Sequence, residues 1–371
     1  MIRVRSTLRR SRTLALVALA LGIAGTLWAA YGIPEMLQAS GQVPQGQARP
    51  TPAPRVSVEG PFTHDNLALY IVRGRSEDNR AYLTLDQGLA ARTVEVREKG
   101  AGAGQDQSTV NSLEIENKSD KWLFLHAGDV VKGGKQDRTI MTDVLLAPRS
   151  TPQTIDAFCV EQGRWTPGQD GLAFKANTAI VSGNPLKRAI QGEKSQSRVW
   201  EEVAKSQARA ISVASPGVAA LSGTGTYNAI AENKALNSGR GAYVTALLPS
   251  LRKHKDAIGL AVAINGKLTA ADVYSSPGLF DALSRKLLDS YALEAVLARG
   301  TAQPPAPPAR QQVESFLTKA AAAPAAIETV GESMRRSTRE TGEAVMYEYG
   351  HLTTANGRRD VTVLHKSYLK K

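Results

Sequence analysis

Two segments of the chain carry side chains that could bind or transform a ligand. The first is residues 132–138, KGGKQDR, and its candidate residues are Lys132, Gly133, Gly134, Lys135, Gln136 and Arg138. Glycines allow backbone N–H groups to approach an anion closely, and neighbouring cations neutralise the anion's charge. The Walker spacing G-x-x-x-x-G-K-[ST] is absent, so the segment predicts anion binding without specifying the anion.

The second segment, residues 161–165, adds an acid, an amide, a cation and an aromatic ring. These are Glu161, Gln162, Arg164 and Trp165. An arginine fork can bind an anion through two hydrogen bonds, and an indole offers a stacking face. If the strands that carry the two segments are neighbours, both segments open onto one pocket. We then expect this pocket to bind an anionic small molecule with a phosphate group, such as an ADP-ribose species.

A purely structural interpretation of the same residues is the alternative. The two glycines could form a tight hairpin turn, Glu161 could pair with either arginine, and Trp165 could lie in the core. Ion-pair networks in β proteins often resemble binding sites, so the sequence alone leaves both interpretations open.

A catalytic interpretation would use Asp129 or Glu161 as general base and His126 as proton carrier. A single histidine at the end of a strand is also typical of a surface residue with satisfied hydrogen bonds. The five histidines are too widely spaced for a recognisable metal motif, and neither H-E-x-x-H nor G-x-S-x-G occurs. We therefore predict no metal and no cofactor, and whether the protein is an enzyme stays open.

The charge distribution and the cysteine content restrict which partners and bonds are expected. The formal net charge is +12, but five arginines against one glutamate give residues 1–41 a charge of +4 and leave +8 for the rest. The other basic residues are scattered and are not interleaved with aromatic residues, so we expect no nucleic-acid partner. Cys159 is the single cysteine, which excludes an intrachain disulfide and predicts a small buried thiol.

The N-terminus predicts a location in the bacterial envelope. Residues 13–33 hold no charge and follow an arginine-rich start, a pattern that suits one membrane-spanning helix or a signal peptide. Arginines before the apolar stretch, and none directly after it, predict a cytoplasmic N-terminus and a domain facing the periplasm or the exterior. We favour a retained inner-membrane anchor over cleavage and secretion, because signal peptides have shorter apolar cores. Residues 34–60 are rich in Gln, Gly, Pro and Ala, which predicts a flexible linker.

The remaining chain predicts an α+β fold, with a β-rich first half and a mixed α/β second half packed as one domain over residues 61–300. Alternation and β-branching predict strands at 67–72, 93–98, 113–116, 122–126, 139–146 and 154–160. Thr84 and Gln87 have the spacing of a helix capping box.

In the second half, helical spacing predicts helices over 197–213 and 241–251, the latter bent or broken near Pro249. Asn265-Gly266 between two apolar runs predicts a β-hairpin over 258–273. Ser276-Pro277 begins another helix, and Gly300 ends it.

A C-terminal extension follows the domain. Residues 301–310 form a proline-rich linker, and residues 311–322 predict an alanine-rich helix. Residues 343–349 and 361–364 flank Asn356-Gly357, which predicts a hairpin able to dock on the main sheet. We therefore expect residues 311–371 to form a helix and hairpin extension.

Several runs resemble one known domain family. They are AGDVVKGGKQDR at 127–138, CVEQGRW at 159–165, SRVW at 197–200, INGK at 264–267 and KLLDSYALEA at 286–295. Together they are similar to the domain associated with ADP-ribosylglycohydrolase and rhodanese-phosphatase proteins, abbreviated ARPP. The resemblance covers about residues 60–300 and keeps an acid, Asp129, after the glycine of the first run. The family's name records association and implies no particular reaction.

Three functions follow as hypotheses. The first is an envelope-tethered domain that binds a phosphorylated or ADP-ribose-like ligand. The second is a hydrolase of phosphate or ADP-ribosyl linkages. The third is a structural or partner-binding module of the envelope.

Overall fold

The computed structural model describes residues 56–100, 111–167, 173–214, 225–355 and 358–371. The predicted apolar leader and most of the predicted linker lie outside these residues. Within the described part of the chain, no helix combines the length and apolarity needed to span a membrane.

The largest element is an eight-stranded sheet in which every neighbouring pair is antiparallel. Its strands, in spatial order, are β1 (Ser57–His64), β2 (Leu67–Arg73), β12 (Ala257–Ile264), β13 (Lys267–Tyr274), β17 (Arg358–Lys370), β16 (Ala344–Ala355), β15 (Met334–Glu340) and β14 (Ala325–Val330). Half of the strands therefore come from the last 50 residues of the chain, and β17 lies between β13 and β16.

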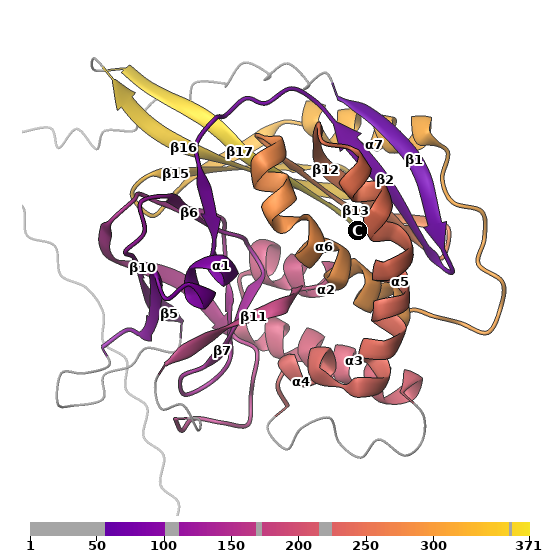
Figure 1. Cartoon of the computed structure of the whole chain (residues 1–371), viewed down its shortest axis with the longest axis horizontal. Helices are drawn as coiled ribbons and strands as arrows, with labels where there is room; N and C mark the ends of the chain where they lie inside the picture. Colours follow the sequence, from indigo (N-terminus) through magenta and orange to yellow (C-terminus); the bar gives the residue numbers. More distant parts are fainter. Residues whose placement is uncertain (1–55, 101–110, 168–172, 215–224, 356–357) are drawn as a thin grey trace, which may run out of the picture. The chain divides into compact units, whose positions relative to one another are not determined.

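Helices cover both faces of this sheet. Leu67, Leu69 and Ile71 of β2 pack in a core cluster that includes α5 (Lys234–Lys253) and α6 (Pro277–Leu297). The alternate residues of β2 pack in a second cluster with α7 (Arg310–Ala322). Successive side chains of a strand point to opposite faces, so the almost entirely buried sequence of β2 serves two cores. Figure 1 shows α5 and α6 in front of the sheet and α7 behind it.

Two smaller sheets carry the residues of interest. A six-stranded sheet has the order β11 (Phe174–Val181), β7 (Asp129–Gly133), β8 (Arg138–Ile140), β10 (Ser150–Cys159), β5 (Ser112–Asn117) and β4 (Val94–Glu98). A three-stranded sheet has the order β3 (Tyr82–Thr84), β6 (Trp122–Leu125) and β9 (Val144–Leu146). A third core cluster joins these two sheets.

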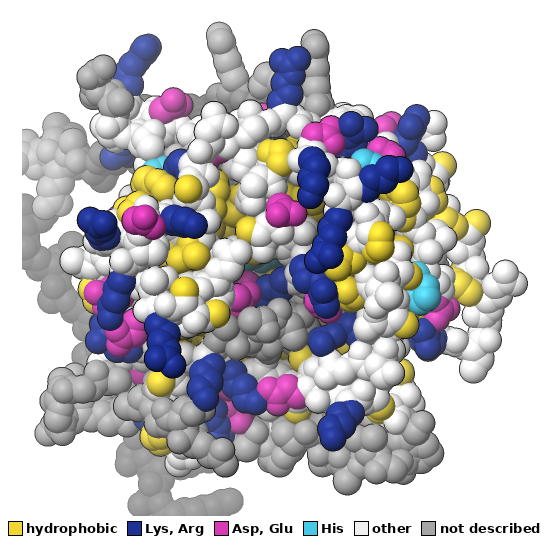
Figure 2. Space-filling view, in the orientation of Figure 1, with side chains coloured by type: hydrophobic (Ala, Val, Ile, Leu, Met, Phe, Trp, Pro, Cys, Tyr) yellow, Lys and Arg dark blue, Asp and Glu magenta, His cyan; other side chains and the backbone are white. Residues whose placement is uncertain are grey.

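The remaining helices pack between the sheets. They are α1 (Leu85–Ala90), α2 (Asn184–Arg188), a π-helical turn (Ala189–Glu193), α3 (Gln196–Val213) and α4 (Asn228–Glu232). Figure 2 shows Lys and Arg side chains spread over the visible face and mixed with Asp and Glu.

The structure confirms the strongest local predictions. Thr84 and Gln87 form both hydrogen bonds of the capping box. Asn265 and Gly266 have φ angles of 50° and 70° at the β12–β13 turn, as a hairpin with positive φ angles requires. The side chain of Ser276 accepts a hydrogen bond from the N–H of Leu279 at the start of α6.

One strand prediction was wrong, and one predicted helix was too short. Residues 139–146 are not one strand, because β8 ends at Ile140 and β9 begins at Val144 in a different sheet. The intervening Asp143 turns inward, and its Oδ1 accepts the N–H of Ala127 at 2.7 Å. The helix predicted over 241–251 is present, but it is longer. It begins at Lys234 and continues through Pro249 to Lys253 without a break, because its packing against α6 outweighs the lost hydrogen bond.

Candidate functional site

The β7–β8 connection, residues 134–137, holds the first candidate segment in a tight turn. Gly133 and Gly134 have φ angles of 131° and 53°. A Cβ atom on Gly133 would lie 2.3 Å from the carbonyl oxygen of Ala173, and one on Gly134 would lie 2.3 Å from the ring of Phe174. Both glycines are therefore required by the turn and by the close approach of the segment that leads into β11.

The backbone N–H groups of this turn bind carboxylates of the protein itself. The N–H of Gly133 donates to Asp137 Oδ1 at 3.0 Å, and that of Lys135 donates to Glu98 Oε1 at 3.0 Å. The N–H of Asp137 donates to Glu161 Oε2 at 3.1 Å. The N–H donors of the segment thus bind carboxylates, and in this structure the carboxylates are three acids of the protein itself.

Arg138 is the most deeply buried cation of the segment. Its guanidinium donates to both oxygens of Glu98 at 3.2 and 3.1 Å, and both side chains are fully buried. It also donates to the carbonyl and side-chain oxygens of Gln136. Arg138 and Gln136 therefore hold β8 to β4, and neither side chain is exposed to a ligand.

Arg164 brings the two candidate segments together. Its guanidinium binds Glu161 at 2.7 Å and donates to the carbonyl oxygens of Gly134 at 2.7 Å and of Gly133 at 3.3 Å. It also lies 3.5 Å from Asp137 Oδ1. The structural alternative, in which Glu161 pairs with an arginine and the glycines form a turn, therefore describes this part correctly.

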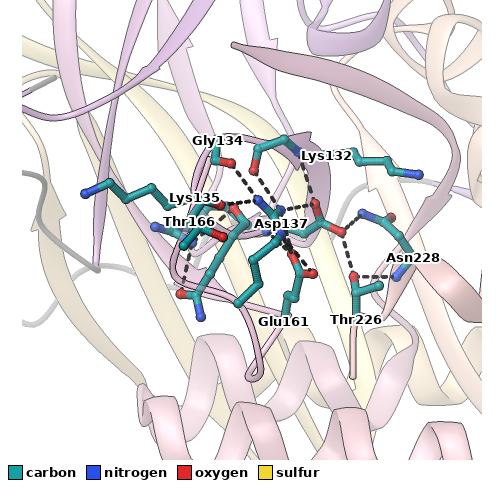
Figure 3. A network of polar contacts seen from close by, with 12 residues as sticks. Lys132, Gly134, Lys135, Asp137, Glu161, Thr166, Thr226 and Asn228 are labelled. Carbon is teal, nitrogen blue, oxygen red and sulfur yellow. Dashed lines mark hydrogen bonds and ion pairs between the residues drawn. The ribbon is translucent and has the colours of Figure 1, made fainter. Parts of the chain in front are cut away.

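Asp137 is the centre of the polar cluster (Figure 3). Its Oδ2 accepts hydrogen bonds from Thr226 Oγ1 and Asn228 Nδ2, both at 2.6 Å. Burial raises the pKa of the Asp137 carboxyl more than these hydrogen bonds lower it, and the nearby Glu161 raises it further. Asp137 therefore gives up its proton less readily than an exposed aspartate does.

Trp165 lies at the open side of the cluster. Its side chain is 43% exposed, so the alternative that places it in the core is wrong. Lys135 Nζ lies 5.0 Å and the Arg138 guanidinium carbon 5.7 Å from the centre of the indole ring. The first and second segments thus meet at this ring.

Two candidate residues point elsewhere. Lys132 is exposed, and its ammonium pairs with Glu232 of α4. Its side chain extends away from Lys135 in Figure 3. Gln162 is exposed beside the cluster.

The catalytic candidates His126 and Asp129 belong to a second buried cluster. Asp129 accepts the N–H of His126 at 2.9 Å and pairs with Lys286 of α6 at 2.8 Å. His126 is 1% exposed, and within the described structure neither ring nitrogen has a hydrogen-bond partner. The expectation of a satisfied surface histidine is therefore wrong.

Several residues of both clusters escaped the sequence analysis. They are Glu98, Asp137, Asp143, Thr226, Asn228, Asp272, Lys286 and His365. Asp137 lies inside the first segment and could have been identified there. The others form their contacts with residues far away in the sequence, for example 40 positions for Glu98 with Arg138 and 222 positions for His365 with Asp143. Cys159 is buried as predicted, and burial raises the pKa of its thiol to about 11.

The fold and the clusters define a mixed sheet-and-helix domain with internally paired charges between its sheets. The family model described as the ARG and Rhodanese-Phosphatase-superfamily-associated Protein domain (ARPP-1) matches residues 55–369. The chain belongs to this family. The match includes β14–β17, which the resemblance drawn from the sequence did not reach. No curated protein and no solved structure matches the chain.

Proposed function

We propose that the protein binds an anionic ligand with a planar ring, of the nucleotide or ADP-ribose class, at the exposed Trp165, next to the buried Lys135 and the partly buried Arg164. One observation carries this proposal: Trp165, a residue that is 43% exposed, has a lysine ammonium 5.0 Å from the centre of its ring. An indole offers a planar ligand a stacking face, and the adjacent cations attract its phosphate.

The charge state of Asp137 supports anion binding at this surface. The cluster holds three cations, Lys135, Arg138 and Arg164, and three carboxylates. Burial raises the pKa of the Asp137 carboxyl, so this group gives up its proton less readily than an exposed aspartate does. A phosphate group beside Lys135 and Arg164 would add negative charge next to it.

Ligand titration of the full-length chain tests this proposal. ADP-ribose, AMP and inorganic phosphate would be titrated while heat release and tryptophan fluorescence are followed. Trp165→Ala should weaken binding of the ring-containing ligands by about 10-fold or more, since stacking contributes about 1–3 kcal/mol per base. Ile211→Ala is the matched control, because Ile211 is also 43% exposed and lies on α3. Equal affinity in the parent chain and Trp165→Ala, or no binding at all, would refute the proposal.

A hydrolase is the second candidate, and the pair of acids Asp137 and Glu161 favours it. Their environments differ, because Glu161 binds Arg164 whereas Asp137 has a raised pKa. Two carboxyl groups in different environments can serve as general acid and general base. Turnover of ADP-ribosyl or phosphate esters should then fall by about 100-fold or more in both Asp137→Asn and Glu161→Gln. Turnover that survives both changes would exclude these roles.

We also propose that the domain is tethered to the bacterial envelope by residues 13–33. The support is the uncharged stretch behind five arginines. In fractionated cells the full-length chain should sediment with membranes, and a variant that lacks residues 1–33 should not. Recovery of the full-length chain in the soluble cytoplasmic fraction would argue against a tether.

A further inference from the structure

Three buried residues outside the polar cluster converge on one point. His126 follows β6, Asp143 lies between β8 and β9, and His365 is on β17. One ligand atom of each lies within 4.8 Å of the others, and all three side chains are buried. We propose that these three residues bind a divalent transition-metal ion of the zinc class.

His126 provides the strongest argument. It is 1% exposed, and neither of its ring nitrogens has a hydrogen-bond partner in the described structure. Burial of a polar group without a partner costs about 1–3 kcal/mol. A neutral imidazole with an unused lone pair is the form that binds a metal, so coordination would satisfy this side chain.

His365 is oriented as a metal-bound histidine usually is. Its Nδ1 lies 2.5 Å from Asp143 Oδ2, and its Nε2 lies 3.2 Å from Asp272 Oδ1. Metal-binding histidines commonly donate their second N–H to a carboxylate, which holds the ring in place. Asp272 serves this role here, since Tyr291 and Ser367 donate hydrogen bonds to it.

Asp143 completes the set of ligands. Its Oδ1 accepts the N–H of Ala127 at 2.7 Å, which directs Oδ2 towards His365. Among the described residues, His365 is its only ion-pair partner. The carboxylate is fully buried, so a cation between it and the two imidazoles would replace a pairing that otherwise depends on protonated His365.

The donor set selects the kind of ion. Two imidazole nitrogens and one carboxylate oxygen suit zinc, cobalt or iron(II), whereas calcium and magnesium prefer oxygen ligands alone. Three protein ligands leave a coordination position open, as in catalytic zinc sites.

Tyr274 connects this point to a cavity. Its ring stacks on that of His365, with the centroids 4.3 Å apart and the planes at 7°. The same side chain lines a cavity of about 500 Å³, together with Arg75, Glu77, Ser275 and Lys366. The Tyr274 hydroxyl is buried without a partner in the described structure.

Protonation of His365 is the alternative to metal binding at this cluster. His365 protonated on both nitrogens would satisfy Asp143 and Asp272, but it would leave both nitrogens of His126 unpaired. His126 therefore distinguishes the two occupants. A metal needs its imidazole, whereas without a metal an apolar ring at this position removes an unsatisfied polar group and leaves the fold at least as stable.

Metal titration of the full-length chain tests the proposal. The chain would be stripped with EDTA, refolded with and without ZnCl₂ or CoCl₂, and followed by thermal unfolding and by the visible absorption of Co²⁺. We expect one Co²⁺ per chain, with the intense bands of a four- or five-coordinate site, and a higher Tm with Zn²⁺.

His126→Phe should abolish the Co²⁺ bands and the Zn²⁺-dependent rise in Tm. Its Tm in EDTA should equal or exceed that of the parent chain, which shows that the variant folds. His254→Gln is the control, because His254 pairs with Glu59 away from this cluster and should bind metal like the parent. If the parent chain refolded with metal shows neither bands nor a Tm shift, or if His126→Phe binds Co²⁺ as tightly, the proposal is wrong.

Discussion

At the scale of single residues, the N–H groups of the β7–β8 turn bind carboxylates of the protein, whereas those of a nucleotide-binding loop bind the phosphates of the ligand. Glu98, Asp137 and Glu161 occupy the N–H donors of the β7–β8 turn, and Arg138 and Arg164 bind the same acids. The turn is thereby held in one conformation without a ligand. A ligand that binds here meets a preformed surface, whose exposed part is the indole of Trp165.

The pair Arg138–Glu98 should be the most sensitive contact of the cluster. Glu98→Gln leaves the guanidinium buried without a counter-charge, and we expect it to lower the free energy of unfolding by about 3–5 kcal/mol. Lys132→Ala, which breaks an exposed pair, should change it by about 1 kcal/mol or less. Urea unfolding measures both, and a small effect of Glu98→Gln would show that the pair is not buried as described.

Asp137 should make stability depend on pH. Because its pKa is raised in the folded protein, the unfolded chain ionises first as the pH rises above 3.8, and the folded state loses stability until Asp137 also ionises. The free energy of unfolding of the parent chain should therefore fall, relative to that of Asp137→Asn, as the pH rises above about 4. Urea unfolding of both chains at several pH values measures this difference, and parallel profiles would contradict the raised pKa.

The sequence predicted that the two candidate segments meet only if their strands are neighbours, and β8 and β10 do pair. The residues that pair with or donate hydrogen bonds to these segments could not be predicted from the sequence. Glu98 lies 40 positions before Arg138, and Asn228 lies 91 positions after Asp137. Local composition shows that a turn can bind an anion, but only the fold shows which anion reaches it.

At the scale of elements, the sequence predicted helix starts and turns correctly where they depend on contacts between residues close together in the chain. The capping box at α1, the β12–β13 hairpin and the start of α6 each depend on residues a few positions apart. The break between β8 and β9 was missed, because the inward turn of Asp143 depends on Ala127 in another part of the chain. The alternation of apolar residues across this break predicted one continuous strand over residues 139–146.

The β12–β13 turn should not tolerate a side chain at Gly266. Its φ angle is 70°, and an added Cβ would lie 2.8 Å from Pro305 Cβ and 2.9 Å from the carbonyl oxygen of Ala306. We expect Gly266→Ala to destabilise the protein by about 1–3 kcal/mol. Gly278→Ala is the matched control, because Gly278 lies in α6 with nothing within 4 Å, and it should stabilise by about 0.5–1 kcal/mol. Equal effects of the two changes in thermal unfolding would contradict this interpretation.

At the scale of the whole molecule, the C-terminal strands complete the main sheet. β17 pairs with β13 on one side and β16 on the other, and His365 of β17 reaches the cluster of His126 and Asp143. The sequence predicted a hairpin here that could dock on the sheet, but not that it continues into β14 and β15. The pairing of β13 with β17 joins residues about 90 positions apart, such as Tyr274 and His365, and hydrophobic periodicity does not show which distant strands pair.

Removal of residues 309–371 should therefore abolish folding. The truncation exposes the edge of β13 and removes α7 from the second core cluster. We expect loss of cooperative thermal unfolding, measured by circular dichroism. A chain that lacks residues 1–47, a range that contributes no helix or strand to the described structure, should unfold like the parent and is the control. A folded truncated core would instead support a dispensable C-terminal module.

The place of β17 also constrains how the protein is made. Because a strand from residues 358–370 pairs with strands on both of its sides, the large sheet cannot close while the ribosome is still synthesising that segment. The two flanking halves of the sheet must wait as separate, incomplete units with exposed edges.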